Sequence, residues 1–129
     1  MIVVDASVMV AFLADVDATG DAARSAIAEN AIAYPVVMPF EVVNTMRRLV
    51  SSRATDADFA RHCINRLTAL RGIEVAFADV ADRIWELRGQ VTAYDAAYVA
   101  VAELLDVPLL TLDDRLRRAK GPRCSFLDL

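Results

Sequence analysis

The sequence contains few of the residues that build disulfide frameworks and zinc centres. Its 129 residues include two cysteines, one histidine and one tryptophan. Cys63 and Cys124 are too few for a disulfide framework and too far apart for a CxxC metal pair, so we expect thiols in the core or on the surface. Because His62 is the only imidazole, a histidine-based zinc site is not expected. This residue usage is typical of a protein in a reducing cytoplasm.

Long apolar runs and a basic leader are also missing. The longest uncharged stretch, residues 30–40, contains two prolines and is much shorter than the roughly 18 apolar residues of a membrane span. The first four residues are apolar, but Asp5 interrupts them where the apolar region of a secretory signal would continue. We therefore expect a soluble, cytoplasmic protein with no membrane partner.

An excess of positive charge is absent as well. Lysine and arginine together number 14 against 18 acidic residues, which gives a net charge of -4 and a pI near 4.9. The net charge of the protein is therefore not expected to attract nucleic acid, and any nucleic-acid partner would bind at a local cluster of basic residues. The basic residues are nevertheless clustered near the end of the chain, at Arg115, Arg117, Arg118, Lys120 and Arg123. Taken alone, such a run is typical of a solvated helix face.

Apolar residues make up 57% of the chain, which is ample for the buried core of a single domain spanning residues 1–129. Apolar runs predict strands at residues 1–4, 73–77, 108–112 and 125–127, and a brief extended piece between Pro35 and Pro39. Helices are predicted at residues 6–14, 17–30, 40–50, 55–70, 79–88, 96–105 and 113–119, with Thr55 and Thr92 opening two of them as capping boxes. Strands that alternate with helices predict a three-layer α/β/α fold with a mainly parallel central sheet of about four to five strands.

Acidic residues recur where these elements meet. Asp5 directly follows the first strand, and Asp113 follows the strand at residues 108–112. Glu41 and Asp95 lie in the first turns of two predicted helices. In open α/β sheets, ligands bind beyond the carboxyl ends of the strands, where the strand order reverses. We therefore expect these four carboxylates to converge on one pocket.

Such a cluster needs a cation. Two negative charges about 4 Å apart repel each other by roughly 4 kcal/mol at an effective dielectric constant of 20. Carboxylate oxygens prefer hard divalent ions such as Mg²⁺ or Mn²⁺. Each acid alone has an ordinary alternative: Asp5 and Asp113 or Asp114 as helix caps, Glu41 as a partner of the helix dipole, and Asp95 as the partner of Thr92. Capping does not explain why the acids all occur at one edge.

Four sequence blocks resemble the PIN-domain family, and specifically the VapC-type ribonuclease toxins of toxin–antitoxin pairs. The blocks are Val4-Asp-Ala-Ser7, Pro39-Phe-Glu-Val-Val-Asn44, Thr92-Ala-Tyr-Asp-Ala-Ala-Tyr-Val-Ala-Val-Ala102 and Leu110-Thr-Leu-Asp113. The resemblance covers the whole chain, and the third and fourth blocks together are its most specific part.

The resemblance assigns the family's catalytic acids to Asp5, Glu41, Asp95 and Asp113, and its supporting polar residues to Ser7, Asn44 and Thr111. Asp5, Asp95 and Asp113 are then the expected metal ligands, while Glu41 orients or deprotonates water. The chain departs from the family at Asp114, where many relatives have a basic residue. Either Asp113 or Asp114 could therefore be the fourth catalytic acid. We choose Asp113 because it lies two residues after Thr111.

The activity implied by the resemblance is that of a Mg²⁺- or Mn²⁺-dependent endoribonuclease toxin. Such toxins are usually homodimers that cut structured RNA, often tRNA or ribosomal RNA, and thereby slow translation. A cognate antitoxin of the VapB type neutralises them. The expected products carry 5′-phosphate and 3′-hydroxyl ends.

The basic residues near the acids are candidates for holding the RNA backbone. Arg48 lies two helical turns beyond Glu41, and three more candidates follow Asp113 closely: Arg115, Arg117 and Arg118. Guanidinium groups suit this role because they hold two phosphate oxygens at once. Tyr98 and Trp85 are expected in the core or at a dimer interface, since apolar residues surround Tyr98 in sequence.

Two other functions fit the same acids less well. A phosphoacceptor signalling domain also uses carboxylates at this edge, but it needs an adjacent acidic pair near the first strand and a lysine after a late strand. Here Asp5 stands alone, and Lys120 lies in a basic helix beyond the last acid. A non-catalytic RNA-binding or interaction module with a PIN-like fold is the stronger alternative. It predicts RNA binding that does not depend on divalent metal.

Overall fold

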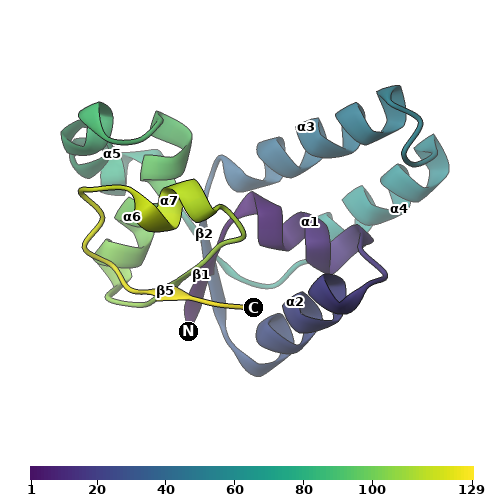
Figure 1. Ribbon diagram of the computed structural model, residues 1–129, viewed down its shortest axis with the longest axis horizontal. Helices are drawn as coiled ribbons and strands as arrows, with labels where there is room; N and C mark the ends of the chain where they lie inside the picture. Colours follow the sequence, from purple (N-terminus) through teal and green to yellow (C-terminus); the bar gives the residue numbers. More distant parts are fainter.

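Short apolar segments spread along the chain form one parallel sheet in the computed structural model, which describes residues 1–129 (Figure 1). The sheet has five strands in the order β3-β2-β1-β4-β5. The strands are β1 (Ile2–Val4), β2 (Ile32–Pro35), β3 (Ile73–Val75), β4 (Leu109–Leu110) and β5 (Phe126–Leu127). The helices are α1 (Ala6–Ala14), α2 (Ala18–Glu29), α3 (Met38–Ser51), α4 (Ala57–Thr68), α5 (Phe77–Glu86), the 3-10 turn η1 (Leu87–Gly89), α6 (Ala93–Leu105) and α7 (Asp114–Arg118).

The most apolar strand lies at the centre of the sheet. All three residues of β1 are buried, and Val3 stands opposite Ala33 of β2 and Leu109 of β4. From β1 the chain builds β2 and β3 on one side, then returns to build β4 and β5 on the other. The strand order therefore reverses between β1 and β4, and a crevice is expected beyond the carboxyl ends of these two strands.

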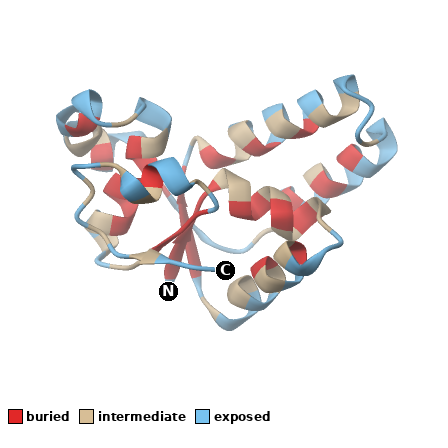
Figure 2. Cartoon of the chain, in the orientation of Figure 1, coloured by how far each residue is buried: buried red, intermediate tan, exposed pale blue.

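Helices cover both faces of the sheet. Figure 1 shows α1 to α4 on one side and α5 and α6 on the other, with α3 and α4 extending away as a helical hairpin. The buried residues gather on the sheet and on the helix faces that meet it (Figure 2). The centre of α6 is buried from Ala96 to Ala102, because its alanines let the helix pack closely on β1 and β2. This arrangement confirms the predicted three-layer α/β/α fold with a parallel sheet.

Several predicted boundaries are wrong. The strand predicted at residues 73–77 ends at Val75, and Phe77 already begins α5. The extended segment ends at Pro35 as β2 and does not run from Pro35 to Pro39. Pro39 instead lies in the first turn of α3, where its fixed φ and missing N–H cost nothing. Asp56, and not Thr55, caps α4, because its Oδ1 accepts from the Phe59 N–H at 2.8 Å. The error at Thr55 arises because threonine and aspartate are both favourable cap residues.

The start of α6 follows the predicted capping pattern more closely. The hydroxyl oxygen of Thr92 accepts from the Asp95 N–H at 3.2 Å, so α6 begins at Ala93 with Asp95 in its first turn. Asp113 caps α7 in a similar way. The molecule has no helix that combines the length and the hydropathy needed to cross a bilayer.

Candidate active site

The four predicted acids line one cleft beyond the carboxyl ends of β1 and β4. Its volume is about 580 Å³, and its walls come from the segments that begin α1, α3, α6 and α7. The acids in it are Asp5, Glu41, Asp95 and Asp113. Residues that lie up to 108 positions apart in sequence are thus brought together by the parallel sheet, as the position of the acids at strand ends and helix starts predicts.

Asp5 is the most enclosed of the four acids. Its residue is only 6% exposed, and its Oδ1 accepts from the Ser7 hydroxyl at 2.6 Å and from the Val8 N–H at 3.0 Å. The Thr111 hydroxyl donates to Oδ2. Asp5 therefore caps α1 and also joins the ends of β1 and β4. The capping role predicted for Asp5 is thus compatible with its position in the cleft.

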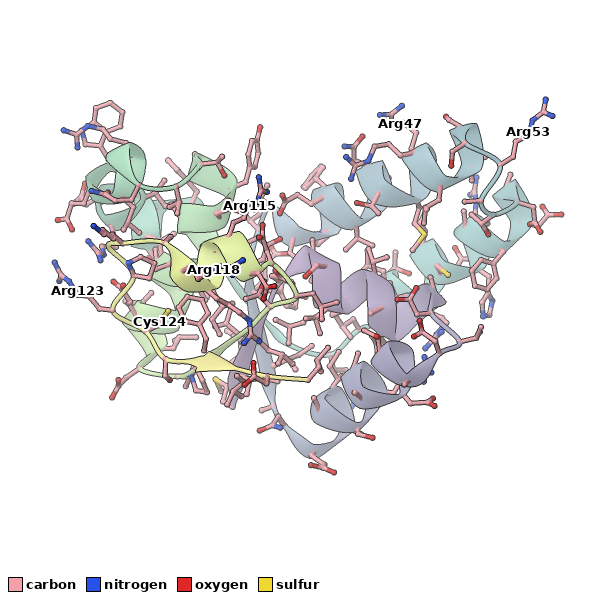
Figure 3. All side chains as sticks on the ribbon, in the orientation of Figure 1. Arg47, Arg53, Arg115, Arg118, Arg123 and Cys124 are labelled. Atoms are coloured by element: carbon pink, nitrogen blue, oxygen red, sulfur yellow. The ribbon has the colours of Figure 1, made fainter.

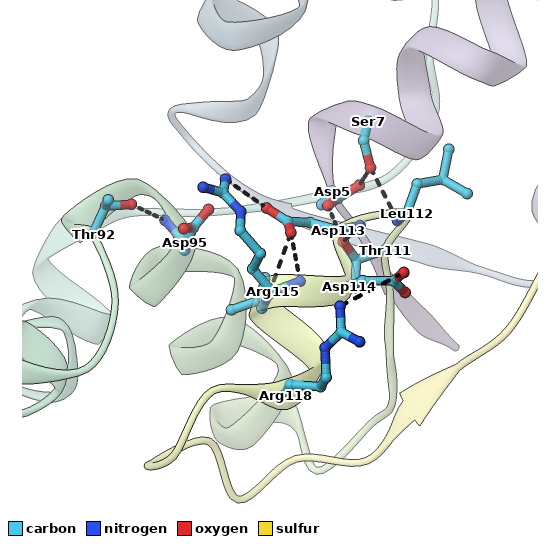
Figure 4. Close-up of polar contacts among 11 residues, drawn as sticks. Asp5, Ser7, Thr92, Asp95, Thr111, Leu112, Asp113, Asp114, Arg115 and Arg118 are labelled. Carbon is cyan, nitrogen blue, oxygen red and sulfur yellow. Dashed lines mark hydrogen bonds and ion pairs between the residues drawn. The ribbon is translucent and has the colours of Figure 1, made fainter.

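Ser7 and Thr111 link Asp5 to the segment that follows β4 (Figure 4). The Ser7 hydroxyl oxygen accepts from the Leu112 N–H at 3.1 Å, and the Thr111 hydroxyl oxygen accepts from the Asp113 N–H at 3.0 Å. Each hydroxyl thus donates to Asp5 and accepts from the loop that carries Asp113. Two of the three predicted supporting residues therefore position two acids at once.

Glu41 is paired with Tyr98, which the sequence predicts for the core or a dimer interface. The buried Tyr98 donates its hydroxyl to Glu41 Oε2, and both residues line the cleft. Tyr98 is therefore a site residue, in addition to being part of the core. The signal that could have found it is its spacing from Asp95, because residues three apart share one face of a helix.

Burial raises the pKa of two of these acids. Desolvation raises the pKa of Asp5 above its ordinary value, although hydrogen bonds from Ser7 and Thr111 act in the opposite direction. Burial is also the largest cause of the raised pKa of Glu41, and the charges of Asp95 and Asp5 add to it. The cleft is therefore unfavourable for bare negative charge, and a proton or a cation relieves this cost.

Asp113 has a different electrostatic environment. Its Oδ1 accepts from the Arg115 N–H at 2.8 Å, and its Oδ2 lies 3.3 Å from the guanidinium of Arg115. Burial alone would raise the pKa of Asp113, but the hydrogen bonds and charge of Arg115 hold it below its ordinary value. Asp114 is exposed and lies outside the cleft, 3.9 Å from Arg118. The structure thus gives Asp113, and not Asp114, the position beside the other acids.

The donor set fits a hard divalent cation in its chemistry. The side chains that line the cleft offer carboxylate, hydroxyl and amide oxygens as ligands, and neither histidine nor cysteine lines it. As the side chains lie, no three acidic, histidine or cysteine side chains converge closely enough to hold a metal. Glu41 is held by Tyr98 and Asp113 by Arg115, so binding an ion requires side-chain rotations within the cleft.

The chain is similar to known proteins over nearly its whole length. The PIN domain model matches residues 2–122. The chain is 37% identical over 125 residues to Ribonuclease VapC1 of Mycobacterium tuberculosis, covering 96% of this chain and 94% of the relative. It is 34% identical over 126 residues to Ribonuclease VapC9 of the same organism, covering 98% and 96%. The chain belongs to the PIN-domain family.

Solved structures show that the fold of this PIN domain is shared more widely. VapC20 of Mycobacterium tuberculosis, described as a sarcin-ricin loop cleaving toxin, has a TM-score of 0.69 at 18% identity and covers 90% of this chain and 92% of its own. VapBC2 from Rickettsia felis, solved with a DNA fragment from its promoter, has a TM-score of 0.69 at 15% identity, with coverages of 99% and 100%. At sequence identities this low, the similarity to these two structures shows a shared fold and nothing more.

The predicted RNA-binding arginines of this PIN domain divide into two groups. Arg48 and Arg115 line the cleft, whereas Arg117 and Arg118 lie outside it. Figure 3 shows Arg115 between the α3 side and the α5–α6 side of the molecule. Arg117 is tied to Asp128 and to the carbonyl oxygens of Thr111 and Leu127, so its guanidinium fastens β5 to β4.

Two other predictions from the sequence, for Asn44 and Trp85, differ from the structure of this PIN domain. Asn44 lines the cleft, but its Oδ1 accepts from Arg47 at 3.0 Å and it makes no hydrogen bond to an acid. Trp85 is predicted to lie in the core or at an interface. Because 69% of it is exposed, the core alternative is wrong and the interface stays a prediction. The Arg88 guanidinium instead lies over its ring, 4.8 Å from the centroid.

Proposed function

We propose that this PIN domain is a Mg²⁺- or Mn²⁺-dependent endoribonuclease toxin that hydrolyses RNA phosphodiester bonds. The observation that carries the proposal is the convergence of four carboxylates from four separate segments on one cleft, two of them with a raised pKa. The mycobacterial relatives that match nearly the whole chain are named ribonucleases, which supports the activity.

We assign the cation to Asp5, Asp95 and Asp113. Asp5 is the fixed point of this set, since three hydrogen bonds from Ser7, Val8 and Thr111 leave it little freedom to rotate. Asp95 and Asp113 lie in the first turn and at the cap of their helices and bring their carboxylates from the other walls. A bound divalent cation would lower the pKa of a water molecule and neutralise charge that develops on the phosphate.

We assign Glu41 the role of orienting the attacking water and accepting its proton. The Tyr98 hydroxyl holds Oε2, which leaves Oε1 for the water. A carboxylate with a raised pKa is a stronger base, and the pKa of Glu41 is raised by burial and by Asp95 and Asp5. Arg48 and Arg115 at the rim of the cleft attract the phosphates that the acids alone would repel.

The substrate we propose is structured RNA, such as tRNA or ribosomal RNA, whose cleavage inhibits translation. The description of VapC20 as a sarcin-ricin loop cleaving toxin supports this class, although the likeness to it is one of fold. The VapBC2 structure supports a VapB-type antitoxin as the partner that silences the enzyme. We further propose a homodimer that acts in the cytoplasm, as the family resemblance implies.

The test is to incubate the purified, antitoxin-free protein with total bacterial RNA and to map new 5′ ends by sequencing. With Mg²⁺ or Mn²⁺ we expect discrete cuts that bear 5′-phosphates and vanish in EDTA. The Asp95→Asn variant is expected to produce none, because it removes one carboxylate while keeping the side-chain volume. Intact RNA with folded, metal-supplied wild type would contradict the activity and favour the non-catalytic RNA-binding alternative.

A further inference from the structure

A second groove adjoins the acidic cleft and shares two residues with it. This groove has a volume of about 440 Å³, within the range of roughly 300–1,000 Å³ that holds small ligands. It runs from η1 across the turn before α6 to α7, and Asp95 and Arg115 belong to both depressions. Figure 4 shows the Arg115 side chain between Asp95 and Asp113. The two depressions therefore form one continuous path.

The two parts of this path carry opposite charge. The cleft contains four carboxylates and only two guanidinium groups, those of Arg48 and Arg115. The second groove contains two guanidinium groups, Arg88 and Arg115, and a single carboxylate, Asp95. A polyanion that places one phosphate in the cleft is thus attracted by the adjoining groove, which we call the arginine groove.

Arg88 is held in place in a way that leaves most of its donors free. Its guanidinium lies 4.8 Å from the centroid of the exposed Trp85 ring, and its Nη1 donates to the Trp85 carbonyl oxygen at 2.9 Å. No other protein acceptor takes its remaining N–H groups. Stacking on an aromatic ring orders a guanidinium before a ligand arrives, which lowers the entropy lost on binding.

The wall beside Arg88 is open. A Cβ added to Gly89 would meet no atom within 4 Å, so a ligand can approach the backbone closely at this point. Gln90 and Thr92 continue the same wall with polar side chains. An extended polar chain with regularly spaced negative charges matches this shape and charge better than a compact apolar ligand does.

We propose that the arginine groove binds the phosphodiester backbone of the RNA segment next to the bond that is cut, with Arg88 and Arg115 contacting its phosphates. Trp85 is a positioning residue that orders Arg88. The proposal rests on the proposed ribonuclease function and extends it by naming the path of the strand beyond the cleft. An acidic protein segment is the competing occupant, and the experiment below distinguishes the two.

The test measures binding of a fluorescein-labelled, 20-nucleotide single-stranded RNA of mixed sequence by fluorescence anisotropy in Mg²⁺. A Glu41→Gln background prevents cleavage and leaves the arginine groove unchanged. In this background, Arg88→Glu is expected to raise the Kd at least about tenfold, because a hydrogen-bonded charge pair is lost and repulsion replaces it. The slope of log K against log salt is expected to fall by about 0.7 for each phosphate contact removed.

Two further variants separate this effect from misfolding and from net charge. Gly89→Glu introduces a carboxylate into the same groove, where a Cβ meets no atom, and is expected to weaken RNA binding similarly. Arg61→Glu on α4 makes the same charge change as Arg88→Glu on an exposed surface away from both depressions and is expected to leave the Kd within about twofold.

The possible outcomes distinguish the groove from the ribonuclease activity. Binding that depends on Arg88 but is accompanied by no cleavage in wild type would support the groove and contradict the enzyme. Cleavage with equal RNA affinity in Arg88→Glu and Arg61→Glu would overturn the groove proposal. Equal RNA affinity combined with Arg88-dependent binding of a labelled poly-glutamate peptide would assign the groove to a protein partner instead.

Discussion

Replacing Asp5 with asparagine is expected to lower the rate of RNA cleavage by about a hundredfold or more, while the protein stays folded. Asp5 is the most buried acid of the cleft, and its carboxylate oxygens accept from Ser7, Val8 and Thr111. Asparagine keeps the volume and one acceptor oxygen but removes the charge that a divalent cation needs. Losing a charged ligand costs several kcal/mol of transition-state stabilisation, which corresponds to at least this factor.

The matched control for this prediction compares the neighbouring residues Asp113 and Asp114. Asp113→Asn is expected to reduce cleavage strongly, since Asp113 lines the cleft, whereas Asp114→Asn is expected to keep the rate within about twofold. Initial rates on the RNA found by end mapping measure the effect, and circular dichroism checks the fold. Wild-type rates in Asp5→Asn, or equal losses in the Asp113 and Asp114 variants, would be incompatible with the assigned ligands.

Replacing Arg83 with methionine is expected to lower the free energy of unfolding by about 2–4 kcal/mol. The Arg83 and Glu103 side chains are only 19% and 14% exposed, and Arg83 Nε donates to Glu103 Oε2 at 2.6 Å. Arg83 also donates to the Gly121 carbonyl oxygen at 2.9 Å, while Glu103 accepts from the Arg123 N–H at 2.7 Å. This ion pair fastens the segment after α7 to α5 and α6, and its loss leaves the largely buried Glu103 carboxylate without its ion-pair partner.

Chemical denaturation measures this loss, and a neighbouring acid supplies its control. Glu86→Gln removes only the exposed partner of Arg83, at 59% exposure, and is expected to cost at most about 0.5 kcal/mol. A loss in Arg83→Met no larger than that of Glu86→Gln would show that the Arg83–Glu103 pair does not stabilise the fold. The larger stability loss in Arg83→Met than in Glu86→Gln is expected at any pH at which Glu103 is charged.

The stability difference between wild type and Arg83→Met is expected to depend on pH. Burial alone would raise the pKa of Glu103, but hydrogen bonds from Arg83 and the Arg123 N–H hold it below its ordinary value. A depressed folded-state pKa means that the stabilisation is complete above the unfolded glutamate value of about 4.3. It is lost as the pH falls through the lower folded value, so the two proteins converge in stability in acid.

The sequence predicts the fold and the convergence of acids because both depend on regular patterns. Alternating apolar strands and helices require a parallel sheet, and such a sheet brings Asp5 and Asp113 to one edge whatever their separation in sequence. The capping role of Asp5 was equally visible, and the structure shows that capping and a place in the cleft coexist. Local rules were therefore sufficient to locate these carboxylates.

The pairing of side chains could not be predicted in the same way. Glu41 meets Tyr98 across 57 residues, and Arg117 finds acceptors on Thr111 and Leu127 only once β4 and β5 pair. Trp85 is exposed because α5 turns it outward beside Arg88, which apolar residue type alone does not indicate. These contacts depend on the packing of whole elements. A sequence pattern in one element can place Tyr98 on the same helix face as Asp95, but it does not identify Glu41 as its partner.

The most direct test of the central claim, that the carboxylates of the cleft bind divalent metal, is a Mn²⁺ titration monitored by the electron paramagnetic resonance of free Mn²⁺. The wild type is expected to remove Mn²⁺ from solution saturably. Asp5→Asn and Asp95→Asn are expected to weaken this binding at least about tenfold, and Asp114→Asn is expected to match the wild type. Mn²⁺ binding that is equal in wild type, Asp5→Asn and Asp95→Asn would contradict the claim.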